Sequence, residues 1–114
     1  ILDGVADLCA DVNNIEQSNE LVSALMRISQ QQNVHIICVI HQNFGSAKLG
    51  TGHLGSALEK KAETVISLEA NTVNKDWTTV KCGRSRGYSF ETFSFEVNEK
   101  GLPIIVGDLY DPLS

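Results

Sequence analysis

The chain has 114 residues, a formal net charge of −5 at pH 7, 42% hydrophobic residues and 20% charged residues. This length fits one domain, and the composition is typical of a soluble globular protein. The longest apolar run, Ile36–Ile40, is far too short to span a membrane, which takes about 20 residues. The negative charge excludes a surface that coats nucleic acid, since phosphate binding needs clustered Lys and Arg, but it leaves room for contact through one loop.

Three cysteines, Cys9, Cys38 and Cys82, are widely separated in the sequence. Because none of them forms a C-x-x-C pair, the pattern predicts neither a zinc site nor a disulfide framework. Free thiols fit a reducing compartment, and we therefore expect a cytoplasmic protein.

A strand and a long helix are predicted first. Ile1-Leu2-Asp3 reads as the end of a buried strand with nothing to cap it, so we expect a fragment of a longer polypeptide. Asn14 and Gln17 form a capping box, and Asn33 predicts the end of the helix after about Gln32. Between them, apolar residues recur at helical spacing: Ile15, Leu21, Val22, Leu25 and Ile28.

The middle of the chain predicts a second strand, a loop and a short helix. Val34–Asn43 is rich in β-forming apolar residues, as expected for a parallel strand buried on both faces. Residues 44–55 carry four glycines and predict a mobile loop. Ser56 and Glu59 form an S-x-x-E capping box that predicts a helix to about residue 62. Val65–Leu68 is the next predicted strand.

The last third predicts an antiparallel meander. Trp77–Cys82 and Phe90–Val97 are predicted strands joined by a turn over Gly83–Ser89, and the second alternates apolar and polar residues. A hairpin turn at residues 98–101 leads into Leu102–Val106. We therefore predict a single α/β domain over residues 1–114, with parallel strands and helices followed by an antiparallel β meander.

Residues 50–55, GTGHLG, match the pattern G-x-G-x-x-G of dinucleotide-binding folds. In those folds the first glycine follows its strand almost directly, whereas here Phe44–Leu49 intervene. After Glu69 the chain turns antiparallel, where a second crossover unit is required. The segment also lacks the G-K-[ST] of a phosphate loop. A flexible loop is therefore favoured over an NAD site.

Four stretches, taken in order over about residues 1–106, resemble the second half of a RecA-like ATPase core in the P-loop NTPase superfamily. The resemblance is to hexameric replicative helicases of the DnaB and RepA types, and it implies a RepA-like or primase-associated helicase of a plasmid or mobilizable element. It implies a RecA-like half-domain from the Walker B strand onward. For the parent protein it implies ATP and Mg²⁺ as cofactors, a hexameric ring, and a role in DNA replication or mobilisation.

The first two stretches are strand ends. Ile1-Leu2-Asp3 resembles a Walker B strand, which implies that Asp3 holds the water shell of Mg²⁺; an aspartate that begins a turn is the alternative. The strand ending Val39-Ile40-His41-Gln42-Asn43 resembles the one whose polar end senses the γ-phosphate. His41 matches the position of this sensor best, and Gln42 is the other candidate. The alternative to a sensor is a cluster of polar side chains at the strand end that hydrogen-bonds to the backbone.

The third stretch, Gly50–Glu63, resembles the helicase segment whose loop faces the central channel and contacts single-stranded DNA. The resemblance implies contacts to single-stranded DNA from Lys48 and His53 as cations and from Thr51 as a neutral donor, all within the loop at residues 44–55. Aromatic stacking is common in single-strand binders, and Phe44 is the one aromatic residue nearby.

The fourth stretch, Lys81–Gly87, resembles the G-K-x-R motif of DnaB-type helicases, in which a basic pair reaches the ATP of the neighbouring subunit. Arg84 stands in the place of the lysine and Arg86 matches the arginine. Both guanidinium groups offer rigid forks suited to phosphate oxygens. An exposed basic turn or a surface ion pair is the alternative.

The sequence departs from the family pattern because the phosphate loop and the catalytic glutamate are missing. We therefore expect these 114 residues alone neither to bind ATP tightly nor to hydrolyse it. Two other functions stay open. One is a recombinase-type or KaiC-like ATPase that assembles without unwinding DNA, and the other is a non-catalytic module for self-association.

Overall fold

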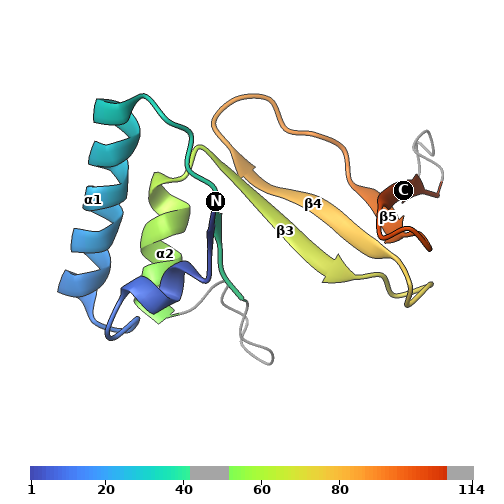
Figure 1. Ribbon diagram of the computed structural model, residues 1–114, viewed down its shortest axis with the longest axis horizontal. Coiled ribbons are helices and arrows are strands. Elements are labelled where there is room, and N and C mark those ends of the chain that lie inside the picture. The colour runs from blue at the N-terminus through green and yellow to red at the C-terminus, as the bar shows by residue number, and fades with distance from the viewer. Residues whose placement is uncertain (42–51, 108–114) are drawn as a thin grey trace. The chain divides into compact units, whose positions relative to one another are not determined.

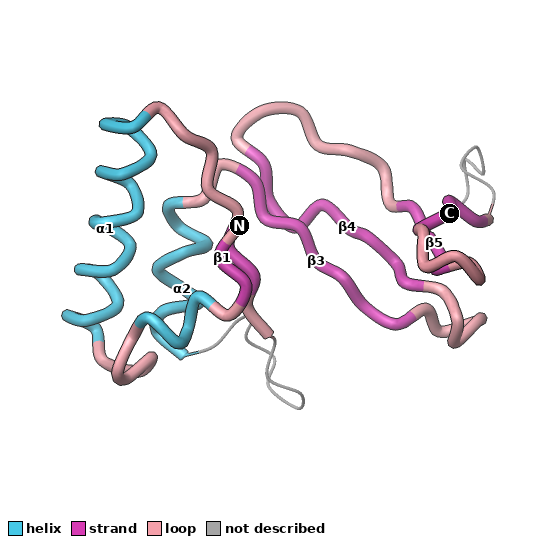
Figure 2. The backbone as a smooth tube through the Cα atoms, in the orientation of Figure 1, coloured by secondary structure: helices cyan, strands magenta, loops and turns pink. Residues whose placement is uncertain are grey.

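The computed structural model describes residues 1–41 and 52–107. Its elements are β1 (Leu2–Asp3), the 3-10 helix η1 (Val5–Leu8), α1 (Ile15–Gln32), β2 (Cys38–Val39), α2 (Gly52–Lys61), β3 (Thr64–Ala70), β4 (Thr78–Ser85), β5 (Phe93–Val97) and β6 (Pro103–Val106) (Figure 1). The chain divides into two compact units, Ile1–Ala62 and Glu63–Ser114. Both α-helices belong to the first unit and the four-stranded sheet belongs to the second (Figure 2). The predicted mixture of helices, a parallel pairing and an antiparallel meander is confirmed, while its assignment to a RecA-like half-domain stays a prediction.

Helix α1 has the ends that the sequence predicts. The side-chain oxygen Oδ1 of Asn14 accepts a hydrogen bond from the backbone N–H of Gln17 at 2.9 Å, which caps the first turn. The side chain of Gln17 accepts from the N–H of Asp11 at 2.9 Å, whereas in a standard capping box it would accept from the N–H of the N-cap residue, Asn14. At the other end Asn33 has φ 51°, and its N–H donates to the carbonyl of Ser29. Both predicted boundaries are therefore confirmed.

The apolar face predicted for α1 is only partly buried. Val22 is 5% exposed and packs against Leu54 and Ala57 of α2. Ile15 and Ile28, at the two ends of the helix, are 61% and 47% exposed. The core of this unit lies where the middle of α1 crosses α2, and it does not reach the ends of the longer helix.

Strand β2 is much shorter than predicted. Of the predicted strand Val34–Asn43, the structure assigns Cys38–Val39 to a strand, and residues 42 and 43 lie outside the described ranges. Val34 and Ile37 are exposed, so burial on both faces is also wrong. In the described residues β2 pairs in parallel with β1 alone, Leu2 with Cys38 and Asp3 with Val39.

Helix α2 begins at Gly52, and the predicted start at a Ser56–Glu59 capping box is wrong. The reason is a cap from elsewhere in the chain. The N–H of Leu54, in the first turn of α2, donates to the carbonyl of Val12 at 2.9 Å. Because Leu54 is also fully buried in the core, the helix is fixed at this end by contacts that local sequence does not reveal.

The same approach of the two segments accounts for Gly52. This residue has φ 55°, a left-handed conformation that side chains disfavour. A Cβ atom here would lie 2.9 Å from the carbonyl oxygen of Val12 and would clash with the side-chain oxygen of Asn13. Of the predicted loop at residues 44–55, residues 52–55 are therefore helical, and the others lie outside the described ranges.

The second unit is an antiparallel sheet in the order β3-β4-β5-β6. Strand β3 was predicted to follow the parallel strands, but it pairs antiparallel with β4 along its whole length, from Thr64 opposite Ser85 to Ala70 opposite Thr78. Strand β4 continues past its predicted end at Cys82, and β5 begins at Phe93, later than predicted. In the described residues, parallel pairing is confined to β1 and β2.

The hairpin turn between β5 and β6 is confirmed. The N–H of Asn98 donates to the carbonyl of Leu102 at 2.9 Å, and the N–H of Gly101 donates to the carbonyl of Asn98 at 2.9 Å. Gly101 has φ 79°, which a glycine adopts without strain. The side chain of Asn98 accepts from the N–H groups of Lys100 and Leu102 and tightens the turn further.

The two faces of the four-stranded sheet differ in chemistry. Residues paired across strands share a face, and alternate residues along a strand lie on opposite faces. The register therefore assigns these residues to one side, here called the apolar face: Ile66, Leu68, Ala70, Thr78, Val80, Cys82, Phe93, Phe95, Val97, Pro103 and Ile105. The opposite side, the polar face, holds the charged and hydrogen-bonding residues of the strands, together with Ile104 and Val106 of β6.

Among the described residues, none of the helices has the length and apolar character needed to cross a membrane.

Candidate functional site

The carboxyl ends of β1 and β2 form one edge of the first unit. Asp3 is the last residue of β1 and lies opposite Val39, the last residue of β2. Gly4 follows with φ 79°, and the N–H of Asp7 donates to the Gly4 carbonyl at 2.9 Å, so the chain turns away at once. The carboxylate of Asp3 is therefore presented, exposed, at the tip of its strand.

His41 lies two residues beyond the end of β2 and is also exposed. The parallel pairing brings the segment that leads to His41 alongside the strand that ends in Asp3. Gln42, the rival for the sensor role, lies outside the described residues. The structure thus brings the two strands of the predicted site together, and the chemical roles of Asp3 and His41 stay predictions.

Cys38 lies one residue from this edge, half-buried in β2. Burial raises the pKa of the Cys38 thiol, and the positive charge of the chain's terminal amino group opposes part of that rise. The thiol therefore stays protonated at neutral pH. Because the thiolate is the nucleophilic form, Cys38 is a poor candidate for a catalytic nucleophile.

The two arginines of the fourth motif belong to the second unit. Arg84 lies in β4 opposite Val65, beside the irregularity where the register shifts between Val65 and Ile66. Its neighbour Gly83 lies close to β3, because a Cβ there would be 3.3 Å from the carbonyl oxygen of Val65. Such a bulge bends the strand and re-aims nearby side chains.

Arg86 follows the end of β4, and its backbone N–H donates to the carbonyl of Glu63 at 2.9 Å. The backbone from Arg84 to Arg86 is therefore tied to the start of β3 and is not the free turn that was predicted over residues 83–89. Both arginines are exposed. The predicted site is distributed accordingly: Asp3 and His41 come from one unit, and the arginine pair comes from the other.

The predicted contacts to nucleic acid are placed only in part. His53 lies in the first turn of α2 and is half-buried. Lys48 and Thr51 lie outside the described residues, as does most of the loop at residues 44–55. Gly55 is buried in α2.

Within residues 1–41 and 52–107, no group of three or more His, Cys, Asp or Glu side chains is arranged to hold a metal ion. Asp3 is a single exposed carboxylate. Mg²⁺ often keeps most of its waters and is bound through one or two carboxylates together with substrate phosphates. One carboxylate at a strand tip is compatible with that mode of binding, and Mg²⁺ at Asp3 stays a prediction.

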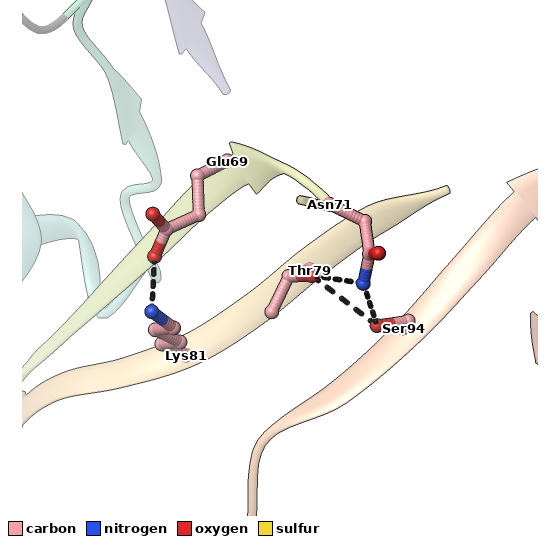
Figure 3. A network of polar contacts seen from close by, with 5 residues as sticks. All are labelled: Glu69, Asn71, Thr79, Lys81 and Ser94. Carbon is pink, nitrogen blue, oxygen red and sulfur yellow. Dashed lines mark hydrogen bonds and ion pairs between the residues drawn. The ribbon is translucent and has the colours of Figure 1, made fainter. Parts of the chain in front are cut away.

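A polar network on the sheet was not foreseen from the sequence (Figure 3). The side-chain amide of Asn71 donates to the hydroxyls of Thr79 and Ser94 at 3.0 and 3.5 Å. Its oxygen accepts from the backbone N–H groups of Val73 and Asn74, both at 2.9 Å. Because these bonds use the full hydrogen-bonding capacity of the side chain, Asn71 fixes the turn after β3 and has nothing left for a ligand.

An ion pair lies on the same face, where the Lys81 ammonium is 2.7 Å from a carboxylate oxygen of Glu69 (Figure 3). Both side chains are about half exposed, so solvent screens the pair and its contribution to stability is small. In the sequence, Thr79 and Lys81 alternate with Val80 and Cys82, and this alternation was the available signal that one face of the strand is polar.

Comparisons with protein-family models, with curated proteins and with solved structures give no match for this chain.

Proposed function

We propose that this chain is the second half of the motor domain of an ATP-dependent DNA helicase or translocase that acts in the replication or mobilisation of DNA. The observation that carries the proposal is the parallel pairing of β1 with β2, with Asp3 at the tip of one strand and His41 just beyond the other. In open α/β sheets, ligands bind at the carboxyl ends of the parallel strands.

In this proposal Asp3 holds the water shell of a Mg²⁺ ion that accompanies ATP. When the backbone beyond Val39 stays extended, His41 falls on the same side of the strand as Val39 and Asp3. A neutral imidazole there can report the terminal phosphate through one hydrogen bond. Gln42 takes this role if the register differs by one residue.

Arg84 and Arg86 act on the nucleotide of a neighbouring subunit, as the resemblance implies. Their exposure and their backbone ties to β3 support the proposal, because an arginine that acts across a boundary must be both accessible and well positioned. Arginines supplied in this way accelerate phosphoryl transfer by about 10³–10⁵ in well-studied cases.

The parent protein is then a ring, by resemblance a hexamer, that holds single-stranded DNA through the segment at residues 44–55. Lys48, Thr51 and His53 are the proposed contacts. Because the 114 residues contain no G-K-[ST] phosphate loop, this chain alone is expected to show no ATP turnover above background. Magnesium-dependent hydrolysis by the purified chain would overturn the proposal.

The sharpest test uses the polypeptide in which a phosphate loop precedes this sequence. Arg86→Ala should lower its ATPase rate by at least about 10³-fold while ring assembly survives, since the arginine stabilises charge that develops in the transition state. Lys100→Ala is the matched control, because Lys100 is an exposed cation in the turn before β6 and should leave the rate unchanged.

Mixing two inactive variants distinguishes action within a subunit from action across a boundary. Asp3→Asn removes the proposed magnesium ligand in one subunit, and Arg86→Ala removes the arginine offered to the next. In mixed rings, some boundaries combine an intact Asp3 with an intact Arg86, so hydrolysis should partly return. Failure to recover any activity in rings shown to be mixed would contradict the action of Arg86 across the boundary.

Strand displacement by the intact ring then separates a helicase from a recombinase-type or KaiC-like ATPase.

A further inference from the structure

The apolar face of the four-stranded sheet carries no charged side chain in any of its four strands. The described part of the second unit supplies no helix or second sheet to cover it. Ile66, Leu68, Val97 and Ile105 are each more than half exposed. Val80 at its centre is 6% exposed, because its neighbours within the sheet cover it. A sheet normally buries one such face against another layer.

The middle of this face is hollowed. Val80, Phe93, Phe95, Pro103 and Ile105 line a shallow depression of about 420 Å³. All five side chains are apolar, so water in the depression has no side-chain partner for hydrogen bonds. An apolar surface that fills the depression would release this water, which is the main driving force for association.

The size of the face suits a small interface. Four strands about 4.8 Å apart and about five residues long give a face of roughly 300 Å² in projection. Protruding side chains make the accessible surface larger, so two such faces together approach the about 1,000 Å² at the low end of specific interfaces. A contiguous apolar patch of this extent is comparable to the largest patch on a typical monomer, about 300–600 Å², and such patches are often functional.

We propose that the apolar face is the contact surface between two copies of this chain, which pack face to face as two sheets about 10 Å apart. In a two-fold interface each patch meets itself, so any charge near the axis would meet its own copy. A face without charge avoids this repulsion. The charged pair of Glu69 with Lys81 lies on the other side of the sheet and stays in water. This inference does not rest on the proposed function.

Oligomeric state tests the proposal directly. Sedimentation equilibrium of the whole chain should give a dimer with a dissociation constant in the micromolar range, as the small interface implies. Leu68→Lys should be monomeric, because it places a charge on the apolar face. Val73→Lys is the matched control: Val73 is 92% exposed in the turn after β3, and its replacement should leave the dimer intact.

Cys82 provides a second readout that requires no substitution. It lies on the apolar face opposite Ile66 and is half-buried, whereas Cys9 belongs to the first unit. Maleimide labelling of Cys82 should slow as protein concentration rises through the dimer range, while labelling of Cys9 stays constant. A chain that remains monomeric up to about 1 mM, about a thousandfold above a micromolar constant, overturns the proposal. The proposal is also overturned if the chain forms a dimer that Leu68→Lys does not dissociate and that leaves the labelling rate of Cys82 unchanged.

Discussion

The two units of the chain solve the problem of burying apolar surface in opposite ways. The unit Ile1–Ala62 builds a small core, in which Leu54 and Val5 are almost fully buried. In the unit Glu63–Ser114, Val80 is the one apolar side chain of the described part that falls below a tenth exposed. The comparison teaches that two packed helices can enclose a core between them, whereas a single sheet hides an apolar face only when another layer covers it.

The largest effect is expected from the core of the first unit. Leu54→Ala should lower its free energy of unfolding by about 2–5 kcal/mol, because it leaves a cavity between α1 and α2. Helical circular dichroism reports this unit, and the fluorescence of the single tryptophan, Trp77, reports the second. The helical signal should be lost at lower urea concentration while the Trp77 transition stays in place. An equal shift of both signals would contradict two separately stabilised units.

A smaller loss is expected at the start of α2. Gly52→Ala should cost about 1–3 kcal/mol, because the new methyl group meets Val12 and Asn13 in a left-handed backbone conformation. Gly87→Ala is its control, since the nearest atom to a Cβ there is the Ser85 hydroxyl at 4.0 Å. Helical circular dichroism in urea measures the loss in Gly52→Ala, and Trp77 fluorescence in urea measures the loss in Gly87→Ala, because the two glycines belong to different units. Equal stability of the two would show that the contact of Gly52 with the loop before α1 is absent in solution.

The sheet unit can be probed through its polar network. Asn71→Ala removes four hydrogen bonds and should cost about 1–2 kcal/mol, measured by the urea dependence of Trp77 fluorescence. Asn71→Asp keeps both acceptor contacts to the turn and loses the two donor contacts. Its stability should lie between those of the wild type and Asn71→Ala, because Thr79 and Ser94 still bond each other. A loss as large as that of Asn71→Ala would place the whole effect in the donor contacts.

The smallest effect concerns pH in the first unit. Burial raises the pKa of the Cys38 thiol, so the folded chain keeps this proton at a pH where the unfolded chain releases it. The unfolded state then binds fewer protons, and stability should fall as pH rises above about 8.5, the usual pKa of a free thiol. Cys38→Ala should lose less stability between pH 7 and about pH 10. Parallel pH profiles for the two proteins would contradict a raised pKa.

The positions of candidate residues at strand ends could be predicted from the sequence, whereas the strand partners of the arginine pair could not. Asp3 and His41 were placed from apolar runs that stop at polar residues, and the structure does pair the two strands. The backbone ties of Arg84 and Arg86 come from Val65 and Glu63, some twenty residues earlier in the chain. Sequence spacing gave no sign of this register, because a bulge in β4 shifts it.

By itself the sequence determined helix α1 and the hairpin turn before β6. The signals at Asn14, Asn33 and Asn98 act on backbone groups within a few residues, so no distant contact is needed to read them. Tertiary structure alone decided the start of α2 and the antiparallel partner of β3. The first depends on the carbonyl of Val12 and the second on the register with β4, and such non-local hydrogen bonds outweigh the weak local preferences that favoured other boundaries.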